Sequence, residues 1–235
     1  MSELDDFSVS LENFSGTTRL FPLPNLVLFP HVLQPLHIYE PRYRESLDEA
    51  LAGDSLMAMA TLAPGWENDY EGRPPLYPSA CLARIILSHK LEDGTSNVML
   101  MGLERIRIIR ELSPIKSFRE VEVEICEDQY PIERAAARAA LFRELHDALV
   151  RIAPGLHLIQ EQLDQLLASG LPLGVLTDIL GYTMDIDVDR KQALLAELNV
   201  HRRAEMLLEH LDTESGEPAC CEAEGLVFPP RFSDN

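Results

Sequence analysis

The sequence has few lysines, and its charge balance is strongly acidic. Only three of its 20 basic residues are lysines, and 39 acidic residues bring the formal net charge to -19. This balance opposes binding to a phosphate backbone, because nucleic-acid affinity depends on basic groups that displace counterions. Arg105, Arg107 and Arg110 are the best candidates for a local basic face. The alternative is that these arginines are solvated on one side of a strand. We expect no nucleic-acid partner.

Long apolar runs are also missing. None approaches the roughly 20 residues that a membrane-spanning helix needs. The N-terminal stretch MSELDDFSVSLENFSG carries acidic residues where a signal peptide carries basic ones. We therefore expect a soluble, cytoplasmic protein that does not contact a membrane.

Cysteine is scarce, which excludes a disulfide framework of the secreted type in a chain of 235 residues. Cys81 and Cys126 stand beside apolar, strand-like runs and are most simply buried small residues. Cys220 and Cys221 are adjacent in an acidic tail, without a second pair at zinc-ligand spacing. We expect no metal site.

The usual catalytic motifs are absent. The chain has no G-x-x-x-x-G-K-[ST] loop, no G-x-G-x-x-G after a strand, no G-x-S-x-G and no H-E-x-x-H. His37 and Glu40 are three residues apart and could form an acid–base or metal pair. The alternative is a hydrogen-bonded histidine and a glutamate near the start of a helix. We expect no catalytic residue, no cofactor and no enzymatic activity.

The pattern of the chain changes once, near Tyr130 and Pro131. Before this point, short alternating or apolar runs predict strands. The Asp93-Gly94 turn, which lies between the runs at 81–88 and 97–103, predicts a hairpin. The fold class is therefore α+β, a small β-barrel or sandwich followed by a helical bundle. The strands are expected at 81–88, 97–103, 104–112 and 118–125, and the later helices at about 131–152, 157–169, 172–184, 187–198 and 200–211.

Five prolines stand in the apolar stretch LFPLPNLVLFPHVLQPLHIYEPRYR at 20–44. Proline cannot donate to a sheet ladder. We expect Pro22 and Pro24 to keep the first strand irregular, and Pro30 and Pro35 to bend the chain at a barrel corner. Pro41 starts a helix that ends before Gly53.

These patterns divide the chain into four parts. They are a mobile acidic arm at 1–18, a β-rich lobe at 19–130, a helical lobe at 131–211 and a flexible acidic tail at 212–235. We expect the two lobes to pack through the leucine stripe that contains Leu141, Leu145 and Leu149.

The loop at 63–80, APGWENDYEGRPPLYPSA, is the best candidate for a binding element. It contains the only tryptophan, Trp66, together with Tyr70 and Tyr77. Aromatic side chains on loops are common in binding sites. The alternative is that Trp66 folds back and caps the barrel. We predict that these three aromatic residues contact a binding partner.

Several blocks resemble the Lon N-terminal, substrate-binding domain family. FPLPNLVLFPHVLQPLHIYEPRYRESLDEAL is similar to the opening of that family, especially of its stand-alone bacterial members without ATPase or protease domains. LYPSACLARI, VMLMGLERIRII and the helical ending LTDILGYTMDIDVDRKQALLAELNVHRRAEMLLEHL are similar to later blocks. His31 departs from the family pattern, because glycine is frequent there, so a tight turn is expected to be altered.

The resemblance implies a PUA-like β-lobe, then a helical lobe, and a function in proteolysis-related quality control. It implies binding of unfolded or exposed polypeptide segments, with a separate protease or chaperone as a further partner. The acidic charge would favour segments rich in lysine and arginine. A PUA-like nucleic-acid-binding module and a small peptidase-related hydrolase are the alternatives.

Overall fold

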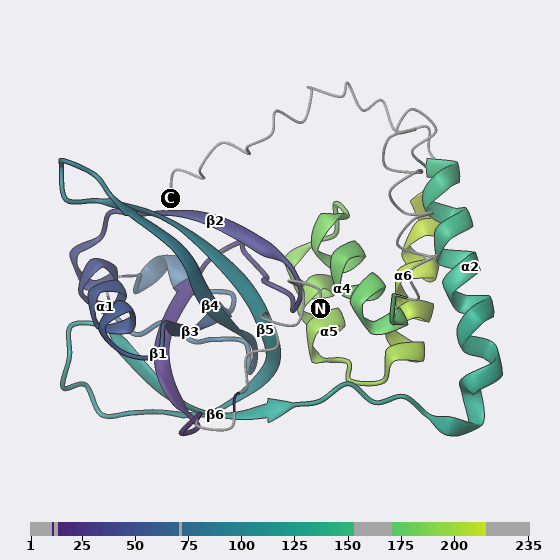
Figure 1. The fold of residues 1–235 in the computed structure, drawn as a ribbon, viewed down its shortest axis with the longest axis horizontal. Helices are drawn as coiled ribbons and strands as arrows, with labels where there is room; N and C mark the ends of the chain where they lie inside the picture. The colour runs from purple at the N-terminus through teal and green to yellow at the C-terminus, as the bar shows by residue number, and fades with distance from the viewer. Residues whose placement is uncertain (1–10, 12–13, 71, 153–170, 215–235) are drawn as a thin grey trace, which may run out of the picture.

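The computed structural model describes residue 11 and residues 14–70, 72–152 and 171–214. Figure 1 shows a curved sheet on one side and a group of helices on the other. The strands are β1 Thr17–Leu23, β2 Leu33–Ile38, β3 Leu56–Thr61, β4 Ser79–Lys90, β5 Ser96–Glu111 and β6 Arg119–Cys126. The helices are α1 Pro41–Ala52, α2 Ala135–Ile152, α4 Leu173–Thr183, α5 Val188–Ala196 and α6 Val200–Glu214, with 3-10 turns η2 Trp66–Asn68 and η3 Ile132–Arg134.

The sheet closes on itself. Its strand order is β2-β5-β4-β3-β1-β6, and β6 pairs with β5 as well as with β1. The β1–β3 pair is parallel and the other pairs are antiparallel. The α+β class is confirmed, with the strands before the change near Tyr130 and most of the helices after it.

Strand β5 holds the sheet together, because β2 pairs with its first half, β6 with its second half, and β4 with most of its length. The prediction of two strands, at 97–103 and 104–112, was wrong: they form one strand of 16 residues. Gly102 lies at its middle, where a Cβ would stand 2.1 Å from the carbonyl oxygen of Phe29. Only glycine permits this close approach of two backbones.

The prolines occupy positions where a missing N–H costs little. Pro35 lies in β2, which is an edge strand paired only with β5. Pro22 lies beyond the part of β1 that pairs with β6. Pro41 is the first residue of α1, and Gly53 follows the last, as predicted.

His31 lies in a tight turn between Phe29 and β2. Its φ is 64°, in the left-handed region that glycine adopts more easily. Its N–H donates to Gly102 O at 2.8 Å, and the Gly102 N–H donates to Val32 O at 2.9 Å. These two bonds hold the turn against the middle of β5, with histidine in the left-handed conformation.

Among the helices that follow the sheet in sequence, α4 and α5 contact it, and α2 lies beyond α6 from the sheet (Figure 1). Phe29 packs on Gly181 of α4, and Gln192 of α5 donates to Thr61 at the end of β3 at 2.7 Å. The prediction that the leucine stripe of α2 joins the two lobes was therefore wrong. Leu145 is buried where α2 packs on α6, and the side chain of Leu149 lies outside what the structure describes.

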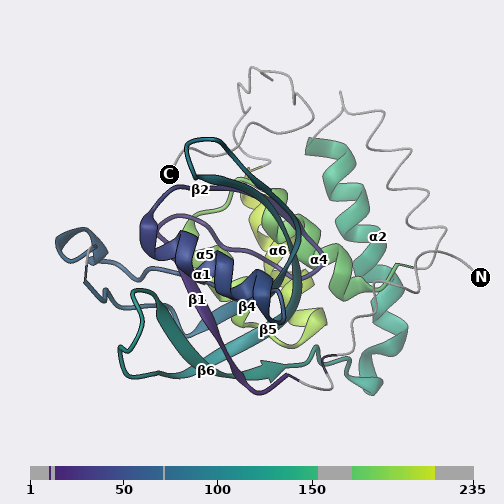
Figure 2. The ribbon, with the colours of Figure 1, turned by 60° about the vertical axis from the view of Figure 1, so that its left-hand side comes forward.

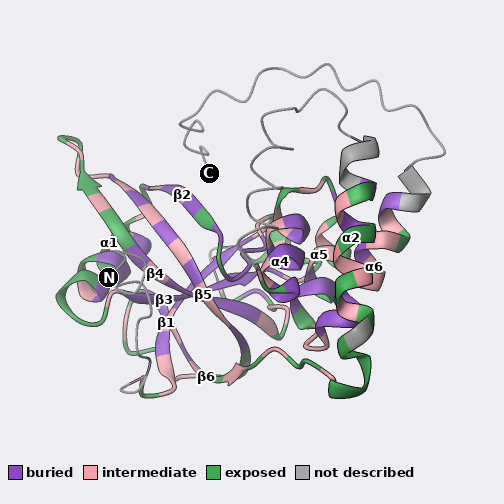
Figure 3. Ribbon diagram, turned by 45° about the vertical axis from the view of Figure 1, so that its right-hand side comes forward, coloured by how far each residue is buried: buried purple, intermediate pink, exposed green. Residues whose placement is uncertain are grey.

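One apolar core runs through both regions. It extends from the strands and α1 into α2, α4, α5 and α6, and Figure 3 shows the buried residues continuing from the sheet into α4. A second, smaller core lies among β1, β3, β4, β5 and β6. Because the larger core is shared, the helical region is not an independent appendage of the sheet.

Some predictions fall on residues that the structure does not describe. The predicted helix at 157–169, most of both predicted terminal arms, and Cys220 and Cys221 lie outside the described residues. Within the described part of the chain, no helix is long and apolar enough to cross a membrane.

Candidate functional site

Residues 63–80, the aromatic loop, connect β3 to β4 and contain η2. Gly65, with φ 94°, precedes the turn that places Trp66 and Tyr70 side by side. Their ring centroids are 5.7 Å apart in an edge-on arrangement. Figure 2 shows this turn projecting from the body on the side where α1 lies. The structure thus joins two of the three predicted aromatic residues.

Tyr70 is held against the start of α1. Its hydroxyl donates to Glu40 Oε1 at 2.7 Å, and the Arg42 guanidinium carbon lies 5.1 Å from its ring centroid. The same guanidinium carbon lies 4.8 Å from the ring centroid of Tyr43. Burial, followed by the hydrogen bond to Glu40, raises the pKa of Tyr70 to about 12. The phenol therefore remains protonated at neutral pH and donates to the carboxylate.

Trp66 does not cap the sheet. It belongs to neither apolar core and is half-buried, in contact with Tyr70. A half-exposed indole on a second aromatic ring leaves apolar surface that a ligand could cover.

Tyr77 serves a different contact. Its hydroxyl donates to Asp189 Oδ1 on α5, and its N–H donates to Thr61 O at 3.0 Å. The hydrogen bond to Asp189 connects the end of the aromatic loop to the helical region, whereas Trp66 and Tyr70 lie against the start of α1. The structure therefore does not bring the three predicted site residues into one cluster.

A basic pocket of about 310 Å³ adjoins Tyr70. It lies between the first turn of α1, the aromatic loop and the β5–β6 connection. None of the described residues that line it is acidic, although the chain as a whole has a net charge of -19. Its lining is Arg42, Tyr43, Gly72, Arg73, Pro114, Lys116, Ser117, Phe118 and Arg119.

The sequence analysis missed this pocket because its four cations come from three separate segments. Arg42 and Arg73 flank the aromatic residues in sequence, and Lys116 follows Pro114 in a polar connection. No local pattern links these positions. The one available signal was that Lys116, in a chain with three lysines, stands only three residues before Arg119.

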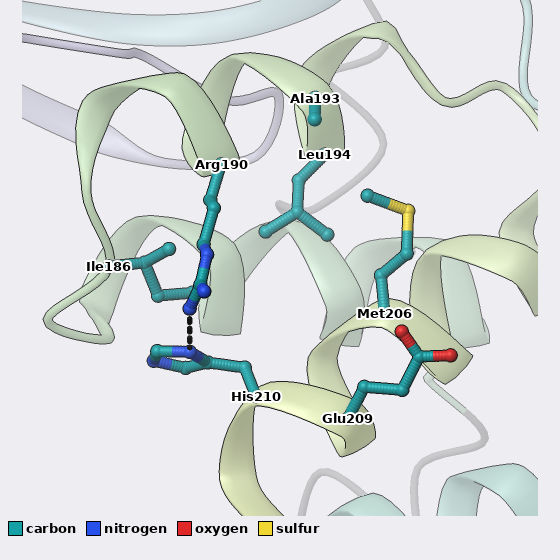
Figure 4. Close-up of a pocket in the computed structure, with 7 residues that line it drawn as sticks. All are labelled: Ile186, Arg190, Ala193, Leu194, Met206, Glu209 and His210. Atoms are coloured by element: carbon teal, nitrogen blue, oxygen red, sulfur yellow. Dashed lines mark hydrogen bonds between the residues drawn. The ribbon is translucent and has the colours of Figure 1, made fainter. Parts of the chain in front are cut away.

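A second hollow lies between α5 and α6 (Figure 4). Ile186, Leu194 and Met206 give it an apolar floor, and Arg190 on its rim forms a hydrogen bond with His210 at 3.1 Å. Its volume is also about 310 Å³. It is an apolar groove that lies away from the predicted aromatic residues.

The candidate basic face of β5 is not formed. Arg107 and Arg110 are exposed and pair with Glu124 and Glu122 on the neighbouring strand. Arg105 is buried, because its side chain points into the seam between sheet and helices. The arginines therefore supply no free cationic surface along this strand.

Arg105 belongs to a buried ion network with Asp128, Asp178 and Arg203. Arg105 donates to both oxygens of Asp178, at 3.1 Å to Oδ2, and to Asp128 at 3.3 Å. Arg203 binds both oxygens of Asp128, at 2.8 and 2.7 Å. The remaining N–H groups of Arg203 donate to Thr177 Oγ1, Glu197 O and Gly174 O.

The network has a structural role, because its arginine and aspartate side chains pair with one another. Burial alone would raise the pKa of Asp128, but the hydrogen bonds and charge of Arg203, with Arg105, outweigh it and hold that pKa below its usual range. His31 approaches from the surface, with Nε2 4.0 Å from Asp178 Oδ2. Every strong donor of Arg203 is occupied, so the network offers no free group for chemistry.

The candidate His37–Glu40 pair is not formed. His37 Nδ1 is hydrogen-bonded to Asn97 Oδ1 at 2.8 Å, whereas Glu40 accepts from Tyr70 and Arg42. Among the described residues, no group of three or more histidine, cysteine, aspartate or glutamate side chains could hold a metal ion. Cys81 is buried, as predicted, and Cys126 is half-buried.

Comparison with known proteins assigns the family. The model of the ATP-dependent protease La (LON) substrate-binding domain matches residues 17–213. The chain belongs to the Lon substrate-binding domain family. The match covers the whole sheet and nearly all described helices, so both regions are parts of one Lon-type unit.

Relatives and solved structures agree with this family. The chain is 26% identical over 196 residues to Lon protease of Desulfosudis oleivorans and 27% identical over 220 residues to that of Geobacter metallireducens. These matches cover 83% and 91% of this chain but 24% and 26% of the relatives, so the chain spans about a quarter of their length.

Two solved Lon N-terminal domains share the fold. The domain from the Mycobacterium avium complex matches with TM-score 0.65 and 19% identity, over 84% of this chain and 99% of that one. The domain protein from Xanthomonas campestris matches with TM-score 0.56 and 21% identity, over 82% and 97%.

Proposed function

We propose that the chain is a non-catalytic Lon-type recognition module that binds unfolded or exposed polypeptide segments. The observation that carries the proposal is the match of a substrate-binding domain model to residues 17–213. A module of this kind holds a segment of its target for another component, such as a separate protease or chaperone. The chemistry of cleavage would belong to that component.

Trp66 and Tyr70 support a peptide site on the aromatic loop. Two adjoining aromatic rings offer a large apolar area with few rotatable bonds, so little conformational entropy is lost when a side chain packs on them. The hydrogen bond from Tyr70 to Glu40 fixes one of the rings before any ligand arrives. A preorganised surface of this kind binds more tightly than a mobile one.

The net charge supports a preference among targets. A charge of -19 creates a long-range attraction for segments rich in lysine and arginine, which raises the rate of encounter more than the final affinity. Binding to such segments should therefore weaken as salt is added.

Replacing Trp66 or Tyr70 by alanine should weaken binding of reduced, unfolded α-lactalbumin by about 30-fold, the effect of losing an aromatic residue at the centre of an interface. The melting temperature should stay nearly unchanged, because Trp66 lies outside both cores. Isothermal titration and thermal unfolding of the full chain measure the two quantities.

The matched control is Ile132→Ala, which removes an apolar side chain that is 86% exposed in η3. It should change neither quantity. Lost stability without a specific loss of affinity would assign Trp66 a structural role, and intact binding would place the peptide site elsewhere. Salt-dependent binding of RNA, or cleavage of casein by the purified chain, would favour the two alternative functions.

A further inference from the structure

We propose that the basic pocket beside the aromatic loop binds a single carboxylate group of a polypeptide. The carboxylate is either the C-terminal one or the side chain of an aspartate or glutamate. The proposal rests on the proposed function, because it names the chemical group through which a bound polypeptide is oriented. Its basis is a pair of arginine donors that the described residues leave without acceptors.

Arg119 is the first of these arginines. Its side chain is 8% exposed, its Nε donates to Glu111 at 2.9 Å, and its Nη2 donates to Glu111 and to Pro74 O. Its Nη1 is buried and has no partner. Glu111 and Pro74 thus fix the plane of the guanidinium and leave one terminal nitrogen for a ligand.

Arg42 repeats this arrangement from the other side of the pocket. Its Nε donates to Glu40 Oε2 at 2.9 Å and its Nη1 to Tyr70 O at 3.5 Å, while Nη2 is buried without a partner. Buried donors of charged groups are rarely left unpaired, because burial without an acceptor is costly. Arg42 and Arg119 line the same pocket, so an acceptor with two oxygens bound there would take up both donors.

The surrounding charges favour a carboxylate over a phosphate. The cations that line the pocket are already bonded to acidic side chains on their outer sides: Arg42 to Glu40, Arg73 and Arg119 to Glu111, and Lys116 to Glu49 and Glu120. The hydrogen bonds that Lys116 donates to Glu49 and then to Glu120 raise its pKa, so it stays charged. Four cations against four carboxylates leave little excess charge, which suits a monoanion held by directed donors rather than a dianion.

The position of the pocket connects it to the aromatic residues. Arg42 lies between the rings of Tyr43 and Tyr70, and Trp66 lies against Tyr70. An apolar side chain beside the bound carboxylate could therefore reach the aromatic loop. The first turn of α1, where Arg42 lies, adds the partial positive charge of a helix N-terminus.

The test uses one short, unfolded peptide in three forms. The first has a free C-terminal carboxylate and no acidic side chain, the second is the same peptide as its C-terminal amide, and the third is the amide with one internal glutamate. Because Trp66 is the only tryptophan, its fluorescence reports binding to the full chain. At least one carboxylate form should bind about tenfold or more tightly than the neutral amide.

The tighter of the two carboxylate forms identifies the source of the group. Equal affinity for all three forms would overturn the carboxylate pocket while leaving polypeptide binding in place. Absence of binding for every form would overturn both. Inorganic phosphate should not displace the peptide, and efficient displacement would mean a phosphate site instead.

Variants then locate the effect. Arg42→Gln and Arg119→Gln should abolish most of the preference for the carboxylate form over the amide, because each removes one of the two unpaired donors. Arg107→Gln is the control, since this exposed arginine pairs with Glu124 outside the pocket. The ratio of the two affinities is the readout, so a general loss of apolar binding does not affect it. An unchanged ratio in Arg42→Gln would overturn the proposal.

Discussion

Replacing Arg203 by methionine should lower the free energy of unfolding by about 3–5 kcal/mol, the usual cost of breaking a buried ion pair on one side. Arg203 is fully buried, and it supplies both hydrogen bonds that hold the Asp128 carboxylate from one direction. Methionine fills similar space but leaves Asp128 and three other acceptors with fewer donors. Urea unfolding followed by circular dichroism measures the change.

The neighbouring residue provides a matched control. Arg202 is 52% exposed and approaches Glu205 and Glu209 only at 3.6 Å. Arg202→Met should change the free energy of unfolding by about 0.5 kcal/mol or less, because exposed ion pairs contribute little. If the two variants were equally stable, the buried ion network would not hold the helices to the sheet.

Leu145→Ala should lower the free energy of unfolding by about 2–5 kcal/mol. Leu145 is fully buried in the larger core, so its truncation removes apolar contacts and leaves a cavity between α2 and its neighbours. The thermal midpoint measured by calorimetry should fall accordingly.

Ile132→Ala is the control on the same part of the chain, since its side chain is 86% exposed. It should leave the midpoint within error of the unaltered protein. An unchanged midpoint in Leu145→Ala would mean that the rotation of α2 about its axis differs from the one described.

Local signals predicted the elements whose ends are chemically marked. Pro41 and Gly53 fixed the limits of α1, and Gly94, with φ 83°, lies in the predicted hairpin turn. Strand β3 was missed, because LMAMAT is buried on both faces and shows no alternation, while its methionines and alanines favour helices elsewhere. Strand β5 was predicted as two strands that meet between Leu103 and Glu104, which is where its pairing with β4 shifts register.

The candidate site was predicted only where its residues are close in sequence. Trp66 and Tyr70 share a loop and were found together, whereas Arg42, Lys116 and Arg119 join them only through the closed sheet. Arg105 was assigned to a solvated face because a strand alone does not reveal its partner. Asp178, which neutralises it, lies on α4, and only the docking of the helices brings the two together.

The buried ion network also has a consequence for how long the folded state lasts. Its members come from β5, the connection after β6, α4 and α6, which meet only after the helices have docked. Contacts between segments so far apart in sequence tend to form late in folding. Arg203→Met should therefore speed unfolding and leave the refolding rate almost unchanged, as measured by stopped-flow kinetics across urea concentrations. Equal changes in both rates would place the network in the folding nucleus. If only the unfolding rate rises, the network governs the lifetime of the folded chain rather than the speed of its assembly.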